Sequence, residues 1–339
     1  MEKADRVSNI HRNVLVAVTV AGLLAALAVA LLAGQGGQGP VAVSANGDPH
    51  AKRTISKDVL NAVDKITLQT PQAELVAKGR ELFRSSAVAK DGESCQGCHT
   101  DGGGDAAIGT TPHDPGVVGI DNSFKGNRDV PTLFNVGRTD PYFWIGDVET
   151  LNEISIATIE NHFTAANQAN KPANAAALTA YMNTIKPPAT DFDRGTMTAA
   201  ALRGEELFQG KATCVACHGG PDFTDNRKHD TFVPQLPTGT DPGALAPATG
   251  SCPKIPADPN PLLALTCAFN TPTLRGIGLQ TTVPYMHNGL CRTGPGAAGV
   301  VVCDTLEKVV QFYNSQSSIA PLQLTAGEQA DLVAYLKAL

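Results

Sequence analysis

Cys95-Gln96-Gly97-Cys98-His99 carries two cysteines separated by two residues and followed immediately by a histidine. This is the pattern by which a c-type haem is attached to a protein. Each thiol adds to one vinyl group of the haem, and the two-residue gap lets both sulfurs reach one edge of the porphyrin. His99 then lies where it can bind the iron. A redox-active pair of thiols or half of a zinc site would also fit a single copy of the pattern.

The pattern occurs a second time, as Cys214-Val215-Ala216-Cys217-His218. Neither copy lies within a larger array of cysteines and histidines of the kind that binds zinc. The sequence therefore predicts two covalently bound c-type haems, each with a histidine on its iron. The residues predicted to hold them are Cys95, Cys98, His99, Cys214, Cys217 and His218.

The segments around the two motifs repeat one another. Upstream, Glu81-Leu82-Phe83 matches Glu206-Leu207-Phe208. Downstream, the matching pairs of segments are 131–137 with 272–278, 141–146 with 284–289, and 150–153 with 305–308. Each half is expected to end in a helix with one apolar stripe, at residues 178–185 and 332–339. We therefore interpret the chain as a duplicated haem domain.

Three threonines are predicted to begin helices. Thr70, before Pro71, and Thr198 would each open a helix that leads toward the following CxxCH motif. Thr325 and Glu328 have the spacing of a capping box at the start of the last helix. The expected fold class is mainly α.

The composition is that of a globular protein, with 42% hydrophobic and 17% charged residues. A formal net charge of −6 argues against a nucleic-acid partner. Aromatic residues make up 5% of the chain, which suits a protein in which two porphyrins supply much of the apolar core.

An apolar run at residues 14–32 is interrupted only by Thr19 and Gly22. This length can span a bilayer, and the basic residues before it favour a cytoplasmic N-terminus. We expect a cytoplasmic segment 1–13, an uncleaved transmembrane anchor 14–34 and a flexible Gly-rich tether 35–69. A cleaved signal peptide is the alternative. In both cases everything after about residue 40 is expected to be exported, and with the anchor the haem-binding part lies in the periplasm at the outer face of the inner membrane.

Four further cysteines suit an oxidising compartment, because an even number can form disulfides. Pairing nearest neighbours joins Cys252 to Cys267 and Cys291 to Cys303, although four cysteines allow three connectivities. The second pair would staple an excursion of the chain beside the second haem.

Together these motifs resemble the bacterial di-haem cytochrome c peroxidase and MauG family, over about residues 70 to 339. The resemblance rests on the two CxxCH motifs and on four other segments, which are 130–135, 142–144, 270–275 and 284–289. It implies two cytochrome c-like haem domains in tandem, at residues 70–188 and 189–339, with one haem on each side of the domain boundary.

The resemblance also implies roles for the two haems. In the family the N-terminal haem meets hydrogen peroxide, the C-terminal haem stores electrons, and a tryptophan lies between them. Carried over to this chain, Trp144 is the bridging tryptophan, and packing of its large ring is the alternative role. The implied protein is a peroxidase-type oxidoreductase that takes electrons from a small cytochrome c or cupredoxin.

Two other functions stay open. One is a MauG-like oxidase that acts on a protein or another substrate by long-range electron transfer. The other is an electron-transfer cytochrome, tethered to the membrane, without enzymatic activity.

Tyr313 aligns with the position over the second haem where peroxidases of the family place a methionine ligand and MauG-type members a tyrosine. A phenolate is a hard, anionic ligand that stabilises ferric iron, whereas a thioether raises the reduction potential. Met286 is the rival ligand, although its counterpart in the repeat is Phe143, which indicates packing. An iron without a sixth ligand is the third alternative.

Over the first haem the candidates are His113, His162 and Glu160. His113 resembles the loop histidine that the family uses as a ligand in the resting state, and a solvated loop histidine is its alternative. His162 could bind the iron or act as acid and base in O–O cleavage, and Glu160 is a nearby carboxylate. The chain departs from the family here, because Ile154 and Thr158 replace the distal Gln and Pro and the expected Glu is missing. This departure favours the electron-transfer alternative.

The family also holds a calcium ion between its domains. The matching positions are Asp129, Thr282 and Pro284, the last two through their main-chain carbonyl groups. Oxygen ligands suit Ca²⁺. A turn before Val130 is the alternative role of Asp129.

Overall fold

The computed structural model of the chain describes residues 55–90, 92, 94–99, 131–146, 148–234, 268–279, 285–292, 300–315 and 322–339. They belong to one compact unit that spans residues 46–339. As expected, most of their regular structure is helical. Within these ranges no helix has both the length and the apolar character needed to cross a membrane. The predicted anchor at residues 14–34 lies outside them and stays a prediction.

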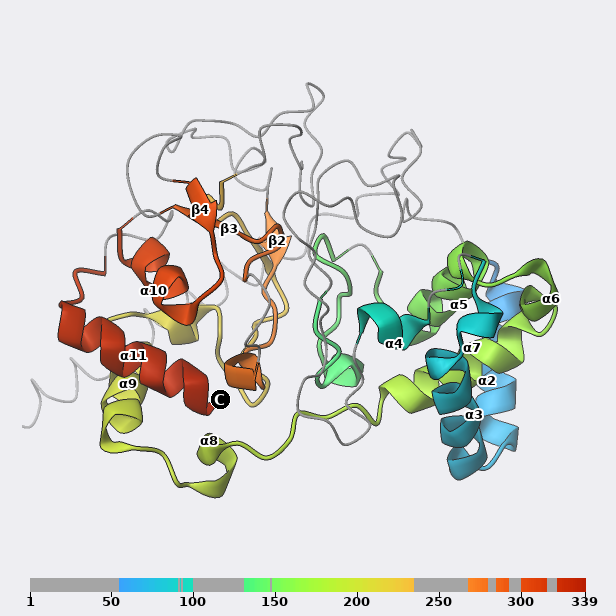
Figure 1. The fold of residues 1–339 in the computed structure, drawn as a ribbon. Coiled ribbons are helices and arrows are strands. Elements are labelled where there is room, and N and C mark those ends of the chain that lie inside the picture. Colours follow the sequence, from blue (N-terminus) through green and yellow to red (C-terminus); the bar gives the residue numbers. More distant parts are fainter. Residues whose placement is uncertain are drawn as a thin grey trace, which may run out of the picture. The chain divides into compact units, whose positions relative to one another are not determined.

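The helices are, in chain order, α2 (Lys57–Gln69), α3 (Gln72–Arg84), α4 (Cys95–Cys98), α5 (Leu151–His162), α6 (Ala165–Gln168), α7 (Lys171–Met182), α8 (Asp191–Arg194), α9 (Ala199–Gln209), α10 (Leu306–Ser315) and α11 (Ala326–Ala338). Short 3₁₀ turns are η1 (Ser86–Val88), η2 (Val136–Arg138), η3 (Cys214–Ala216) and η5 (Ile277–Leu279). Antiparallel pairs join β1 (Lys228–His229) to β2 (Phe269–Asn270) and β3 (Leu290–Arg292) to β4 (Val300–Val302). Figure 1 shows α2, α3, α5 and α7 gathered in one group and α9, α10 and α11 in another.

The helix before each CxxCH motif packs closely against the last helix of its half. Gly79 of α3 faces the carbonyl of Ala177 in α7, and Gly204 of α9 faces the carbonyl of Asp331 in α11. At both positions a Cβ atom would overlap the facing backbone, so the close approach of the helices requires glycine.

An aromatic pair completes each of these helix contacts. The ring centroids of Phe83 and Tyr181 are 5.3 Å apart, and those of Phe208 and Tyr335 are 5.2 Å apart, both in edge-to-face geometry. The two halves therefore repeat the same helix packing with equivalent residues.

Replacing Gly79 by alanine is expected to lower the free energy of unfolding by about 1–3 kcal/mol, because the added methyl group forces the two helices apart. Gly204→Ala should have the same effect. Gly327→Ala in α11 is the matched control, because its Cβ position has nothing within 4 Å and alanine is the better helix former. Chemical denaturation of the haem-loaded protein measures all three changes. A loss at Gly327 as large as that at Gly79 would contradict the packing account.

Two clusters of buried side chains lie on either side of Pro187 and Pro188 along the chain. The first extends from Val63 to Ile185, and the second extends from Phe208 to Leu339. Each half thus has its own core, while the domain limits 70–188 and 189–339 stay a prediction.

The segment expected to be a flexible tether, 35–69, contains a helix in its second part. Ser56 caps α2 with its side chain, and Val63 on the inner face of α2 is fully buried. Val59 and Ile66 pack against the first cluster from the same face. The tether prediction is therefore wrong for residues 57–69, whose apolar spacing favours an amphipathic helix.

The predicted helix starts at Thr198 and Thr325 are confirmed. The Thr198 side chain accepts a hydrogen bond from the backbone three residues on, and Thr325 forms the predicted capping box with Glu328. The next helix after α2 starts slightly later than expected, with Pro71 at its N-cap, because Thr70 is still bonded to α2 as its C-cap.

The disulfide predicted between Cys291 and Cys303 is present. It joins β3 to the residue that follows β4, and both cysteines are fully buried. Cys252 and Cys267 lie outside the described residues, so their pairing stays a prediction.

Asp222 links the two halves of the chain. Its carboxylate accepts a hydrogen bond from Nδ2 of Asn135 at 3.0 Å and forms an ion pair with Nη2 of Arg138 at 2.6 Å. Asp222 is itself buried, and it follows His218 by four residues. The contact therefore joins the segment of the second motif to the segment that leads to Trp144.

Candidate functional site

Residues of both CxxCH motifs line one cavity of about 350 Å³. Cys95 and His99 contribute from the first motif, and Cys214, Cys217 and His218 from the second. Most of the wall is apolar. Apolar residues that line it include Phe83, Leu133, Val136, Tyr142, Phe143, Leu151, Ile154, Leu178, Met182, Val233, Phe269, Leu274, Ile277, Tyr285, Val309 and Leu322. A cavity of this kind suits a large apolar ring system.

The histidine of the second motif is held in the form that binds metal. The ring nitrogen Nδ1 of His218 lies 3.0 Å from the carbonyl oxygen of Phe223. A carbonyl only accepts, so Nδ1 carries the proton and Nε2 is the ligand nitrogen. Burial lowers the pKa of His218, which keeps the imidazole neutral, as a metal ligand must be.

The two thiols of the second motif are not in a disulfide. Burial raises the pKa of Cys214 to about 12 and also raises the pKa of Cys217. A redox-active dithiol needs a lowered thiol pKa, so this interpretation of the motif is disfavoured. Two protonated thiols and a neutral imidazole beside an apolar cavity fit a c-type haem.

The first motif forms α4, which packs against α3. The backbone N–H of His99 donates to the carbonyl of Cys95 at 2.7 Å, so the motif coils as one helical turn. This turn brings Cys95 and His99 to the same cavity wall. The side chain of Cys98 is outside the described atoms, so its predicted thioether bond stays a prediction.

The structure brings both rival ligands of the second haem to the cavity. Tyr313 of α10 and Met286 line it together with His218. Burial raises the pKa of Tyr313 to about 12, and a hydrogen bond with Thr231 acts in the opposite direction. Met286 has a left-handed backbone, with φ 74°, and its repeat partner Phe143 has φ 62°. This shared conformation supports the alignment of the two halves, and both ligand assignments stay predictions.

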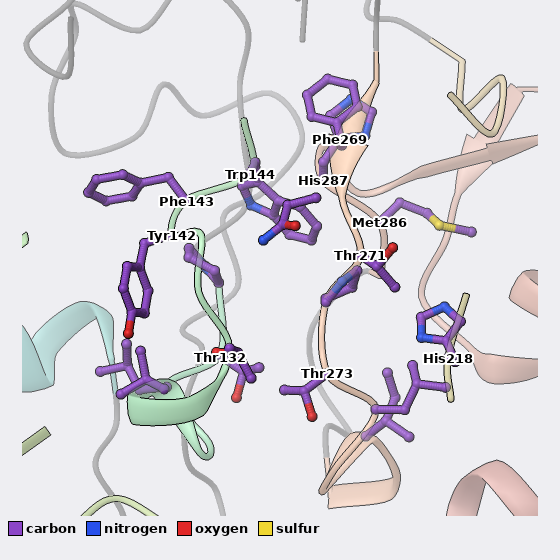
Figure 2. A pocket seen from close by; sticks show the side chains of 18 of the residues that line it. Thr132, Tyr142, Phe143, Trp144, His218, Phe269, Thr271, Thr273, Met286 and His287 are labelled. Atoms are coloured by element: carbon purple, nitrogen blue, oxygen red, sulfur yellow. The ribbon is translucent and has the colours of Figure 1, made fainter. Parts of the chain in front are cut away.

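Trp144 lines the cavity that the two motifs share, and Figure 2 shows it among the other side chains of the wall. Its ring centroid is 6.3 Å from that of His287, in edge-to-face geometry. His287 in turn stacks on Phe269 at 3.6 Å. Figure 2 shows Tyr142 and Phe143 on one side of Trp144, with His287 and Phe269 on the other. The predicted bridging tryptophan therefore contacts the second half directly.

His162 and Glu160 do not line the cavity. Both lie in the last turn of α5, where Glu160 forms an ion pair of 2.5 Å with Lys171. The polar residues that α5 presents to the cavity are Ser155 and Thr158. Since Lys171 engages the carboxylate at the rim of the helix, a role of Glu160 at the iron loses support. His113 lies outside the described residues.

The candidate calcium ligands Asp129, Thr282 and Pro284 also lie outside the described residues. Among the residues that the structure describes, one other group has the geometry of a metal site, namely Cys217, Asp225 and His229. Nε2 of His229 lies 2.8 Å from Oδ2 of Asp225. Because Cys217 belongs to a haem motif, we do not assign a separate metal to this group.

Sequence reasoning missed Asn270, whose side chain also lines the cavity. Its carboxamide donates to the carbonyl of Pro141 at 2.6 Å, across the two halves. The residue stands in one of the segments that carry the family resemblance, but its role depends on a contact between residues 129 positions apart. Nothing in a linear pattern reports such a contact.

The pKa of Asp230, beside the cavity wall, gives a pH prediction. Burial raises this pKa to about 6 from 3.8, so the folded chain holds its proton more tightly than the unfolded chain between these pH values. The free energy of unfolding contributed by this group is therefore lost as the pH rises from about 4 through 6. Asp230→Asn should stabilise the protein by about 1–2 kcal/mol at pH 7.5 after allowance for partial exposure, and very little at pH 4.

Denaturation at the two pH values measures this difference. Asp191→Asn is the control of opposite sign, because a hydrogen bond from Arg194 lowers the pKa of Asp191, and its replacement should not stabilise at pH 7.5. An Asp230→Asn gain of equal size at both pH values would rule out the burial effect.

The chain is similar to proteins of known type. Residues 73–184 match a family model described as di-haem cytochrome c peroxidase. A cytochrome-c peroxidase, IdrP2, of Denitromonas iodatirespirans is 28% identical over 326 residues, which cover 79% of this chain and 82% of the relative. The methylamine utilization protein MauG of Methylorubrum extorquens is 26% identical, covering 78% of each chain.

Solved structures agree with these relatives. A MauG-like protein associated with microbial copper homeostasis is 25% identical, with a TM-score of 0.57 over 78% of this chain and 88% of that one. The diheme peroxidase BthA from Burkholderia thailandensis has a TM-score of 0.58 at 21% identity, covering 80% of this chain and 86% of that one. The second comparison shows a shared fold.

Proposed function

Because the chain belongs to the di-haem cytochrome c peroxidase and MauG family, we propose that it reduces hydrogen peroxide at the haem of its first motif. Electrons would be exchanged through the haem of the second motif. The chain is a peroxidase-type oxidoreductase of the di-haem class. We propose the separate roles of the two haems, with peroxide reduced at the first and electrons exchanged at the second.

Each haem would be held by thioether bonds to the two cysteines of its motif, with His99 and His218 as iron ligands. Haem iron supplies the one-electron redox chemistry when it is bound. The chain's own residues orient the ligands and exclude water. Phe223 fixes the His218 ring through its carbonyl oxygen, and the apolar lining of the cavity lowers the local dielectric.

One observation carries the proposal, which is that residues of both motifs and Trp144 line a single cavity. Reduction of one peroxide to two waters consumes two electrons and two protons. A chain with two haems joined by a short aromatic contact can hold both electrons before peroxide arrives. Trp144 and its neighbour His287 would form this link.

Proton delivery at the first haem has to proceed without the distal carboxylate that the family resemblance leads one to expect. The polar residues of α5 that line the cavity are Ser155 and Thr158, and neither is a carboxylate. The Ser155 hydroxyl already shares a hydrogen bond of 2.8 Å with Thr179. We propose that His113 or solvent supplies the protons, with Thr158 as a hydrogen-bond partner of peroxide.

A MauG-like oxidase of a protein or other substrate is the second candidate. Tyr313 favours it, because a buried phenol faces the cavity at the second motif. If Tyr313 binds that iron, Tyr313→Phe should change the absorption spectrum of one haem and leave the other unaltered. Met286→Leu is the matched test of the rival ligand. A Tyr313→Phe spectrum identical to that of the parent protein would remove the assignment.

The cellular setting belongs to the same proposal. We propose that the haem-binding part lies in the periplasm, anchored to the inner membrane by residues 14–34. Its electron donor would be a small cytochrome c or cupredoxin. A calcium ion held by Asp129, Thr282 and Pro284 would stabilise the region between the motifs.

Peroxide consumption tests the proposed activity. The haem-loaded protein, supplied with a reduced small c-type cytochrome, should oxidise two cytochromes for each peroxide that disappears. A Cys95→Ser, Cys98→Ser variant, which lacks the first attachment site, should lose this turnover. If the parent protein consumes peroxide no faster than this variant does, the electron-transfer alternative replaces the proposal.

A further inference from the structure

The geometry points to Asn270 as a positioning residue that fixes Trp144 for electron exchange between the two haems. This inference rests on the proposed function of Trp144. It concerns the Trp144 loop, which we define as residues 141–146, and the way in which the second half of the chain holds that loop.

Asn270 bonds to the Trp144 loop at two places. Its side-chain Nδ2 donates to the carbonyl of Pro141 at 2.6 Å, and its backbone N–H donates to the carbonyl of Trp144 at 2.7 Å. Pro141 begins the loop, and Trp144 carries the bridging ring. One residue of the second half thus holds the loop at its start and at the main chain of Trp144.

Two further hydrogen bonds of the loop are made within the first half. The N–H of Tyr142 donates to the carbonyl of Val148 at 2.7 Å, and the N–H of Gly146 donates to the carbonyl of Phe143 at 3.1 Å. Phe143 and Gly146 both have left-handed backbone conformations. These bonds set the shape of the loop, but they do not fix its distance from the second half.

Asn270 is well suited to fix that distance, because it is itself rigidly held. It lies in β2 and pairs with Lys228 of β1. The next residue, Thr271, donates its N–H to the carbonyl of Arg227 at 2.8 Å. Phe269, on the other side of Asn270, stacks on His287, the ring that faces Trp144. The same short strand therefore supports both sides of the aromatic contact.

Such positioning matters because the transfer of electrons or groups depends steeply on geometry. Misplacing a reacting group in an enzyme by about 1 Å can slow catalysis by about 100-fold, and electron transfer between aromatic groups also slows as their separation grows. If the carboxamide bond to Pro141 is removed, the Trp144 loop keeps its internal bonds and its backbone bond to β2. The indole can then move relative to His287, which is the displacement expected to slow the exchange.

Asn270→Leu tests the inference with little change in side-chain volume. Among the described residues, the Oδ1 atom of Asn270 is buried without a hydrogen-bond partner, so leucine removes no other polar contact of the side chain. The chain contains one tryptophan, so all tryptophan fluorescence comes from Trp144. Haem quenches this emission by energy transfer, which makes the residual intensity a measure of the position of Trp144.

The haem-loaded Asn270→Leu variant is expected to keep two haems per chain, to show brighter Trp144 emission, and to exchange electrons between the haems about tenfold more slowly. Exchange is followed after flash reduction of one haem. Asn174→Leu is the matched control, because its buried carboxamide also donates to a main-chain carbonyl, that of Asn167 at 2.9 Å, and Asn174 is not among the residues that line the cavity. It should leave the emission and the exchange rate unchanged.

Unchanged emission and exchange in Asn270→Leu would overturn the inference. If that variant loses haem, Asn270→Ser, whose hydroxyl is too short to reach Pro141, is judged by the same two readouts. Trp144→Phe separates the inference from the proposed function. Brighter emission in Asn270→Leu, combined with normal exchange in Trp144→Phe, would uphold the positioning of Trp144 and refute its role as the electron route.

Discussion

A Cys214→Ser, Cys217→Ser double variant is expected to carry one haem per chain where the parent protein carries two. Serine has nearly the volume of cysteine but cannot form a thioether with a vinyl group. His218 alone would then have to retain a haem that no covalent bond holds. The pyridine haemochrome assay, referred to protein concentration, measures the change.

The disulfide provides the matched control for this variant. Cys291→Ser, Cys303→Ser also removes two cysteines from the second half, and it breaks an observed disulfide. Loss of a disulfide costs about 2–4 kcal/mol of stability, yet both haems should stay attached. Two haems in the Cys214→Ser, Cys217→Ser variant would contradict the assignment of the second motif.

Replacing Trp144 by phenylalanine should have the second large effect. The smaller ring keeps an apolar side chain at this position, but it lengthens the gap to His287, whose ring centroid now lies 6.3 Å away. We expect electron exchange between the haems, and peroxide turnover with it, to fall by on the order of 10- to 100-fold. Flash reduction and steady-state peroxide consumption measure the two rates.

Phe163→Leu is the control for general damage to the first core. Phe163 is almost completely buried in the first cluster and does not line the cavity. Its replacement should lower the stability of the protein and leave the exchange rate unaltered. Equal exchange rates in Trp144→Phe and Phe163→Leu would show that Trp144 has no special role.

Local signals in the sequence predicted much of the fold. Thr198 and Thr325 begin helices because their side chains cap the first turn, and this effect depends only on residues a few positions apart. The spacing within each CxxCH motif is local in the same way. The N-cap of α3 is Pro71 rather than the predicted Thr70, because Thr70 ends α2.

The helix α2 shows a second limit of sequence reasoning. The Gly-rich composition near residues 34–39 favours a tether, and the predicted tether extends to residue 69. Val63 nevertheless belongs to the buried core of the first half. The Gly-rich composition of the first part concealed a short amphipathic pattern, in which Val59, Val63 and Ile66 face the core.

The candidate site was less accessible from the sequence. The family resemblance pointed to Trp144 and Tyr313 and left Met286 as the rival ligand, and all three line the cavity. The sequence did not reveal the hydrogen bond from Asn270 to Pro141 or the ion pair of Asp222 with Arg138, because both join segments that are distant in the chain. His162 was expected near the iron from its helix face, yet the cavity wall ends at Thr158, one turn earlier.

The most direct test of the account is a single turnover in which the fully reduced, haem-loaded protein is mixed with one equivalent of hydrogen peroxide. Stopped-flow absorption then follows both haems. The account predicts that both become ferric within one turnover, because one peroxide takes up two electrons and the cavity around Trp144 connects the two donors. Two haems that stay ferrous, or one that is oxidised while the other keeps its electron, would contradict it.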